Sequence, residues 1–274
     1  MKDTEAWKVI ASGNGDGVFL AADFAFTGRP EAGFAELVPL LDTEHAAWET
    51  VPPRFESGGS VFAVKGADYL SWWTDDLRKS GRQVKAVLGY CVGSVYAAAL
   101  AEKIAEWQSE RPVVLLFDPE RPSKETLYWQ FHKAVGNLHS VLPSVKIETA
   151  QKAGEQVARA SEDLQEIGRE LFKIFQSVGS VAFESAGLDD IRSGELLHLV
   201  GVFLAYLVAA GDIDFKEAWK SSIACSSSSP RSGLNPLPSK VRSHLVRQEL
   251  HFDVEHADLL RSGDVARAVS RLLS

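Results

Sequence analysis

The fold is decided by residues 84–108, which read VKAVLGYCVGSVYAAALAEKIAEWQ. The first five of these residues are mostly apolar and predict a short buried strand. Residues 95–108 are rich in alanine and glutamate, which favour a helix. Between them lies Gly-Tyr-Cys-Val-Gly. The chain is therefore expected to pass from strand to helix through a sharp turn that carries a cysteine at its centre.

This turn matches the nucleophile elbow Gly-x-Ser-x-Gly, with sulfur in place of oxygen. A nucleophile on such a turn has a strained backbone, and Gly89 and Gly93 remove side chains that would collide with the strand and the helix. The turn also places Cys91 at a helix N-terminus, whose partial positive charge favours a thiolate. The amide of Val92 then faces the position of an oxyanion. We predict that Cys91 is a nucleophile; the alternative is a buried structural cysteine.

The remaining chain has the pattern of an α/β protein with a helical insertion. Short β-rich runs alternate with helical segments up to the elbow, which is typical of a mostly parallel sheet. The expected strands are 7–11, 18–26, 48–54, 84–88, 112–117, 221–225 and 246–254, and the expected helices of the core are 31–41, 68–79, 95–108 and 263–273. Residues from Ser123 to Trp219 are almost wholly helical by pattern. We predict one domain over 1–274 with a helical lid at about 123–220 and a Ser/Pro/Gly loop between the last two strands.

A cysteine nucleophile needs a base, and the base needs an orienting group. Asp118 ends the strand that follows the elbow helix, and His256 follows the last expected strand. Parallel α/β sheets carry their active sites at the carboxyl edge, where these residues would meet. We therefore predict a triad of Cys91, His256 and Asp118. The alternatives are His251 for the histidine and Asp253 or Asp258 for the acid.

Composition excludes several classes of function. With 29 basic and 37 acidic residues the formal charge is −8, and no dense basic cluster is present, which argues against nucleic-acid binding. Two cysteines, Cys91 and Cys225, are too few for a disulfide scaffold or a four-cysteine zinc site. The glycines of residues 13–17 lead into a strand and not a helix, so they predict a turn and not a dinucleotide site. No cofactor or metal is expected.

The sequence predicts a cytoplasmic protein without a membrane partner. The N-terminal residues have no apolar core of the signal-peptide type. The longest apolar run, residues 196–210, has 15 residues. A membrane span needs about 20, so a buried helix is expected there.

Four features together resemble thioesterases of the α/β-hydrolase fold that work beside polyketide synthases and nonribosomal peptide synthetases. They are LGYCVGS at 88–94, VVLLFD at 113–118, the helical stretch before the penultimate strand, and EHADLL at 255–260. The resemblance covers the chain from about Val18 to its end. It implies that Asp118 is the catalytic acid, that His256 is the catalytic histidine and that the helical stretch is a lid.

Two positions depart from that family. The usual nucleophile is serine, whereas this chain has Cys91. The usual His-Gly segment after the first long strand is absent, and AADFAF at 21–26 stands in its place. The resemblance implies that this segment gives the second oxyanion-hole amide, for which Ala25 is the candidate beside Val92. The elbow also resembles dienelactone hydrolase, a compact family without a large helical insertion, which we rank second.

The cysteine indicates the class of reaction. An acyl-cysteine is a thioester, close in energy to the phosphopantetheine thioester that would deliver the acyl group. We therefore expect cleavage of an acyl thioester, bound to a carrier protein or coenzyme A, with release by hydrolysis, acyl transfer or cyclisation in natural-product biosynthesis. Arg121 and Lys124 are candidates for docking the carrier protein. A catalytically silent hydrolase-fold binding protein is the alternative from another class.

Overall fold

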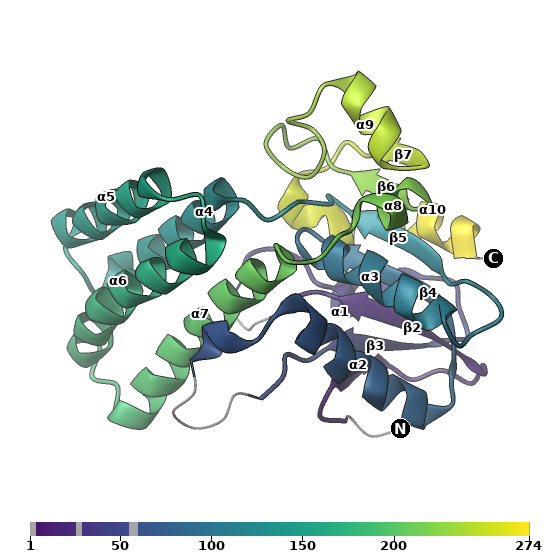
Figure 1. Ribbon diagram of the computed structural model, residues 1–274, viewed down its shortest axis with the longest axis horizontal. Helices are drawn as coiled ribbons and strands as arrows, with labels where there is room; N and C mark the ends of the chain where they lie inside the picture. Colours follow the sequence, from purple (N-terminus) through teal and green to yellow (C-terminus); the bar gives the residue numbers. More distant parts are fainter. Residues whose placement is uncertain (1–3, 26–28, 55–59, 274) are drawn as a thin grey trace. The chain divides into compact units, whose positions relative to one another are not determined.

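The computed structural model describes residues 4–25, 29–54 and 60–273. The chain divides into two compact units. The sheet unit takes residues 1–53, 67–121 and 213–274, and the helical unit takes residues 54–66 and 122–212. Figure 1 shows the elements of both units in chain order. Every residue of the predicted triad belongs to the sheet unit.

Within the described residues of the sheet unit, seven strands form one sheet in the order β1-β3-β2-β4-β5-β6-β7. They are β1 Trp7–Ala11, β2 Gly17–Ala22, β3 Ala46–Thr50, β4 Gln83–Tyr90, β5 Val113–Phe117, β6 Ile223–Ser226 and β7 Gln248–His251. Neighbouring strands are parallel except for β1 and β3, which pair antiparallel. The predicted mostly parallel α/β sheet is confirmed, and the strand that leads into the elbow, β4, is its central strand.

Helices cover both faces of this sheet (Figure 1). On one face α1 (Phe34–Leu37), the short helix His256–Arg261 and α10 (Gly263–Leu273) bury apolar side chains against alternate residues of β4, including Ala86 and Leu88. On the other face lie α2 (Gly66–Ser80), α3 (Gly93–Ala105) and α8 (Lys216–Lys220). The Trp73 ring of α2 meets Tyr96 of α3 edge-on with centroids 5.2 Å apart, and the indole N–H of Trp219 in α8 donates to the Ser94 carbonyl at 3.2 Å. These contacts fix the helix that begins at the elbow.

The helical unit contains most of the stretch of 123–219 that the sequence predicts to be helical, whereas α8 at its end belongs to the sheet unit. Its helices are α4 Lys124–Gly136, α5 Ser144–Ala160, α6 Leu164–Ser185 and α7 Asp190–Ala210. Side chains of Ser123, Asp163 and Asp189 cap the starts of α4, α6 and α7 by accepting backbone N–H groups. That this unit is a lid stays a prediction, as does the assignment of the whole chain to one domain.

One helix of the described residues, α7, is long and apolar enough to cross a membrane by length and composition alone. Half of its most apolar window is buried inside the protein. Core helices of globular proteins meet the same criteria, so the finding is weak support for a span.

The structure differs from the sequence prediction in the lengths of β2 and β7 and in the loop before the last strand. The strand predicted over 18–26 ends at Ala22, because the amide of Asp23 donates to the Thr50 hydroxyl at 3.3 Å instead of continuing a ladder. Phe26 lies outside the described residues. The predicted loop before the last strand contains α9 (Ser239–Leu245), which has no fully buried side chain and hence no apolar periodicity to reveal it. The last strand is only four residues long.

Gly93 allows the first turn of α3 to pack against the end of β2. A Cβ atom on Gly93 would lie 2.1 Å from the carbonyl oxygen of Ala22, where no flexible side chain can move away. We expect Gly93→Ala to lower the free energy of unfolding by about 3 kcal/mol or more. Gly263→Ala is the matched control, because Gly263 also begins a helix and its Cβ would meet only the end of the Arg267 side chain, at 3.5 Å. Urea unfolding of both variants tests this, and equal stabilities would contradict it.

Candidate active site

The elbow holds Cys91 in a left-handed backbone conformation. Among the non-glycine residues that the structure describes, positive φ occurs only at Cys91 (51°) and Asp118 (43°), the two residues predicted as nucleophile and acid. Such a conformation costs about 1–3 kcal/mol and persists only where the surroundings hold it. The Cys91 amide donates to the Phe117 carbonyl at 2.9 Å, and the Cys91 carbonyl accepts the amides of Ser94 at 3.1 Å and Glu120 at 3.2 Å. The strained residue is thus hydrogen-bonded on both sides of its Cα.

The motif glycine before the cysteine also has a packing role. A Cβ atom on Gly89 would lie 2.6 Å from the Cα of Ser94. Val92 is buried and stands immediately before the first residue of α3, so its amide belongs to the N-terminal end of that helix. Ala25 is exposed and borders residues outside the described ranges, whereas Ala22 is the part of this segment that packs against the elbow. The assignment of Val92 and Ala25 to an oxyanion hole stays a prediction.

The predicted acid and base lie side by side. Nδ1 of His256 is 2.7 Å from Oδ2 of Asp118, whose side chain is completely buried, while the His256 side chain is 22% exposed. The other carboxylate oxygen, Oδ1, accepts the amide of Ser227 at 2.8 Å. The amide of His256 donates to the Ser229 hydroxyl at 2.8 Å, which fixes the backbone of the histidine. With Nδ1 facing the carboxylate, Nε2 is the ring nitrogen that can exchange a proton.

Two of the three alternative residues, His251 and Asp258, make contacts elsewhere. His251 is exposed, and its Nε2 lies 3.4 Å from a carboxylate oxygen of Glu249. Asp258 accepts a hydrogen bond from Arg261 at 2.8 Å. The structure therefore pairs the histidine and the acid that the sequence ranked first, and it gives no such pairing for these two alternatives.

Tyr90 joins the strand that leads to Cys91 with His256, a contact that the sequence did not reveal. Its ring stacks on the His256 imidazole with centroids 4.8 Å apart and planes inclined by 13°. Its hydroxyl donates to the His256 carbonyl at 2.9 Å. Burial raises the pKa of Tyr90 far above its usual value, so the hydroxyl keeps its proton and stays a donor. Because Tyr90 directly precedes Cys91, the strand that leads to Cys91 also supports His256.

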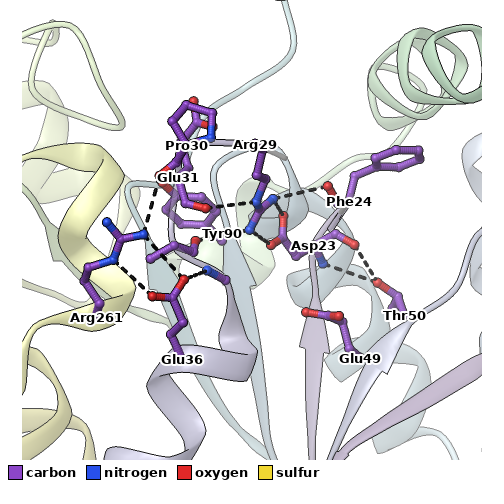
Figure 2. A network of polar contacts seen from close by, with 12 residues as sticks. Asp23, Phe24, Arg29, Pro30, Glu31, Glu36, Glu49, Thr50, Tyr90 and Arg261 are labelled. Carbon is purple, nitrogen blue, oxygen red and sulfur yellow. Dashed lines mark hydrogen bonds and ion pairs between the residues drawn. The ribbon is translucent and has the colours of Figure 1, made fainter. Parts of the chain in front are cut away.

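Arg29 organises the segment after β2, where the second oxyanion amide is expected (Figure 2). Its guanidinium forms a two-pronged ion pair with Asp23, in which Nη1 lies 2.9 Å from Oδ1. The same group donates to the carbonyls of Phe24 at 3.2 Å, Glu31 at 3.2 Å and Ala32 at 3.1 Å. A bidentate arginine pair is among the strongest polar contacts, and here it ties Arg29 to the residue that follows β2.

The same loop is tied to the chain beside His256. The amide of Ala32 donates to the carbonyl of Ala257 at 2.8 Å. Arg261 bonds Glu36 of α1 at 3.1 Å and the carbonyl of Pro30 at 3.4 Å (Figure 2). The guanidinium carbon of Arg29 lies 5.6 Å from the centre of the Tyr90 ring, on which His256 stacks. The segment after β2 and the histidine are therefore held by one connected set of contacts.

A carboxylate outside the predicted triad contacts the sulfur of Cys91. The thiol of Cys91 donates to Oε2 of Glu120 at 3.4 Å, and Glu120 is half-buried. No sequence motif marks this residue, although it follows Asp118 by two positions. Of the two docking candidates, Lys124 forms an ion pair with Glu162 within the helical unit, and Arg121 belongs to the sheet unit. Among the described residues, no three His, Cys, Asp or Glu side chains gather as a metal site.

Comparison with known proteins supports the fold. No protein-family model matches the chain, and no curated protein matches it in sequence. A four-domain nonribosomal peptide synthetase is similar in structure, with a TM-score of 0.58 and 11% identity over 99% of this chain but only 20% of its own length. The NocB thioesterase domain from the nocardicin cluster has a TM-score of 0.55 and 15% identity, covering 98% of this chain and 99% of that one. A bromoperoxidase from Bacillus anthracis has a TM-score of 0.52 and 12% identity, covering 97% and 94%. The predicted α/β-hydrolase fold is confirmed, and such low identities establish the fold alone.

The two cysteines should differ sharply in reactivity. Cys225 lies on β6 and is fully buried, and burial together with the Asp118 charge raises the pKa of its thiol to about 12. Cys91 is partly exposed. We expect iodoacetamide to label Cys91 in the folded protein and Cys225 only after unfolding, because alkylation needs an accessible thiolate. Peptide mass spectrometry before and after denaturation measures this, and comparable labelling of both in the folded protein would contradict it.

Glu49 is a buried carboxyl group beside the Arg29 network (Figure 2). Its Oε1 has no hydrogen-bond partner among the described residues, and Lys8 Nζ lies 4.0 Å from Oε2. Burial, followed by the charge of Asp23, raises the pKa of Glu49 from 4.5 to about 7. The folded protein therefore holds this proton to higher pH than the unfolded chain does.

The stabilising contribution of this proton is complete below about pH 4.5 and is lost as the pH rises through about 7. Between pH 5 and pH 8 we expect the free energy of unfolding of the wild type to fall by about 2.5 kcal/mol more than that of Glu49→Gln. Glu106→Gln, a change in an exposed surface ion pair, should follow the wild type. Urea unfolding at several pH values tests this; parallel curves for the wild type and Glu49→Gln would refute it.

Proposed function

We propose that this protein is a thioesterase-like enzyme that cleaves an acyl thioester through an acyl-cysteine on Cys91. The observation that carries the proposal is the 2.7 Å pairing of His256 with Asp118 at the sheet edge where the elbow presents Cys91. The contacts of Tyr90 with His256 and of Cys91 with the end of β5 hold these three residues on neighbouring elements. A nucleophile on an elbow, a histidine and an orienting carboxylate make a set suited to acyl transfer.

In the proposed reaction, Nε2 of His256 takes the thiol proton as the Cys91 sulfur attacks the acyl carbon. Asp118 holds the imidazole in the tautomer that leaves Nε2 free for this proton and stabilises the imidazolium. The amide of Val92 at the start of α3 would stabilise the oxyanion. The bond to the departing thiol breaks, and that thiol receives the proton from His256. An acceptor with an O–H or N–H group then attacks the acyl-cysteine and restores the Cys91 thiol.

The choice of a thioester substrate rests on the sulfur nucleophile and on the size of the helical unit. Transfer from one thioester to another is nearly neutral in energy, so Cys91 suits an acyl donor that is itself a thioester. The helical unit of 122–212 separates Asp118 from His256 in the chain, which disfavours the compact dienelactone-hydrolase alternative. Two of the structural neighbours are a nonribosomal peptide synthetase and a thioesterase domain, which supports a carrier-bound donor. The bromoperoxidase neighbour shows that the same fold also hosts other chemistry.

Replacing the nucleophile or the base tests the proposal. Cys91→Ala should abolish turnover of acyl thioesters while circular dichroism shows a folded protein. His256→Ala should lower the rate by about 10²–10⁴-fold, the usual contribution of a general base. Steady-state assays with a chromogenic acyl thioester measure the rate. Intact-protein mass spectrometry detects the acyl adduct.

Cys225→Ala is the matched control, since it removes the other thiol and should leave both the adduct and the turnover intact. Normal activity in Cys91→Ala would refute the nucleophile. A His256→Ala rate within about tenfold of wild type would refute the base. A wild-type protein that binds acyl thioesters without forming an adduct would instead favour the silent binding protein.

A further inference from the structure

We propose that Glu120 is a further catalytic residue and that it directs the acyl group to an amine acceptor. This inference rests on the proposed function of Cys91. Its starting point is the contact between the reacting atom and a carboxylate outside the triad, in which the Cys91 thiol donates to Oε2 of Glu120 at 3.4 Å. The triad's own carboxylate is occupied, because Asp118 accepts from Ser227 with one oxygen and contacts His256 with the other.

The backbone holds Glu120 in this place. Its amide donates to the Cys91 carbonyl at 3.2 Å, so the residue is fixed to the elbow at both its main chain and its side chain. The left-handed conformation of Asp118 turns the chain back toward the elbow. Gly233, with a φ of 56°, packs against that turn, and a Cβ on it would lie 2.7 Å from the Cα of Asp118. The position of Glu120 therefore follows from the same turn that presents the catalytic acid.

A carboxylate at this position opposes the first half of the reaction. Negative charge beside a thiol, together with the hydrogen bond that the thiol donates, stabilises the protonated sulfur. Cys91 must lose this proton to His256 before it attacks the donor thioester. Glu120 thus slows acylation of Cys91. Its place beside the sulfur is explained if it accelerates the transfer of the acyl group to the acceptor.

The second half of the reaction supplies such a benefit. In the acyl-enzyme the sulfur has no proton, and the Glu120 carboxylate lies beside the S–C bond that must break. When an amine nitrogen bonds to the acyl carbon it gains positive charge, which a neighbouring carboxylate stabilises in the transition state. His256 then removes a proton from the nitrogen, the S–C bond breaks, and the sulfur receives that proton. The products are an amide and the Cys91 thiol. Water gains less, because its proton passes directly to His256 and its oxygen carries little positive charge.

The test compares Glu120→Gln with Glu106→Gln, which removes one exposed carboxylate at the far end of α3. The acyl-enzyme is formed from an acyl N-acetylcysteamine thioester, and its products are measured with and without hexylamine. We expect the amide-to-acid ratio of Glu120→Gln to fall about tenfold relative to wild type. In the same variant, the midpoint of the pH profile for alkylation of Cys91 should move down by about one pH unit, because a neighbouring charge is lost. Glu106→Gln should change neither quantity.

In the proposed role, loss of the Glu120 carboxylate makes the Cys91 thiol easier to deprotonate and makes transfer to the amine slower. A purely structural defect would not produce these two opposite effects. An unchanged amide-to-acid ratio, or a wild type that forms no amide, would overturn the acceptor role. An unchanged or raised alkylation midpoint would overturn the influence of Glu120 on the thiol. Should Glu120→Gln not fold by circular dichroism, Glu120→Asp, which withdraws the carboxylate from the sulfur, should move both quantities in the same directions. Failure of the wild type to form any adduct on Cys91 would reject the proposed function itself, and the alkylation profile would still test the contact.

Discussion

The left-handed backbone of Cys91 is the constraint around which the carboxyl edge of the sheet is built. Gly89 leaves room for α3 to turn sharply over its own strand, and Gly93 leaves room for that helix to approach β2. The end of β5 bonds the Cys91 amide, and Glu120 bonds its carbonyl. The same chain segment then adopts a second left-handed residue at Asp118. The packing of the central strands, whose last residues are buried, holds the strained backbone at these two positions.

The carboxylates at the carboxyl edge of the sheet each have a different partner. Asp118 is completely buried and faces the imidazole of His256, whereas Glu120 is half-buried and faces the sulfur. Asp23 forms an ion pair with Arg29 just after β2. The Asp118 carboxylate accepts the Ser227 amide and the Asp23 carboxylate accepts from Arg29, whereas the Glu120 carboxylate accepts from the Cys91 thiol. In the proposed reaction, Asp118 therefore supports His256 while Glu120 acts on Cys91.

The mostly parallel sheet, the strand–turn–helix at Cys91 and the pairing of His256 with Asp118 could be predicted from the sequence. They follow from apolar periodicity, from glycines at fixed offsets and from the rule that parallel strands end at one edge of the sheet. The sequence was not sufficient to predict Tyr90 beneath His256, Arg29 on Asp23, or Glu120 on Cys91. These contacts depend on side chains brought together over long sequence separations or by a left-handed turn, neither of which has a periodic signature. Helix α9 was missed for a related reason, since an exposed short helix leaves no apolar stripe.

The placement of the two cysteines has a consequence for redox chemistry. Cys91 follows β4 and Cys225 lies on β6, with β5 between them, so their Cα atoms are about 10 Å apart by strand spacing. A disulfide needs Cα atoms within about 7 Å. An oxidant that converts Cys91 to a sulfenic acid therefore meets no resolving thiol among these 274 residues. Recovery of the Cys91 thiol then requires a thiol from solution, and without one oxidation proceeds to sulfinic acid and permanent loss of that thiol.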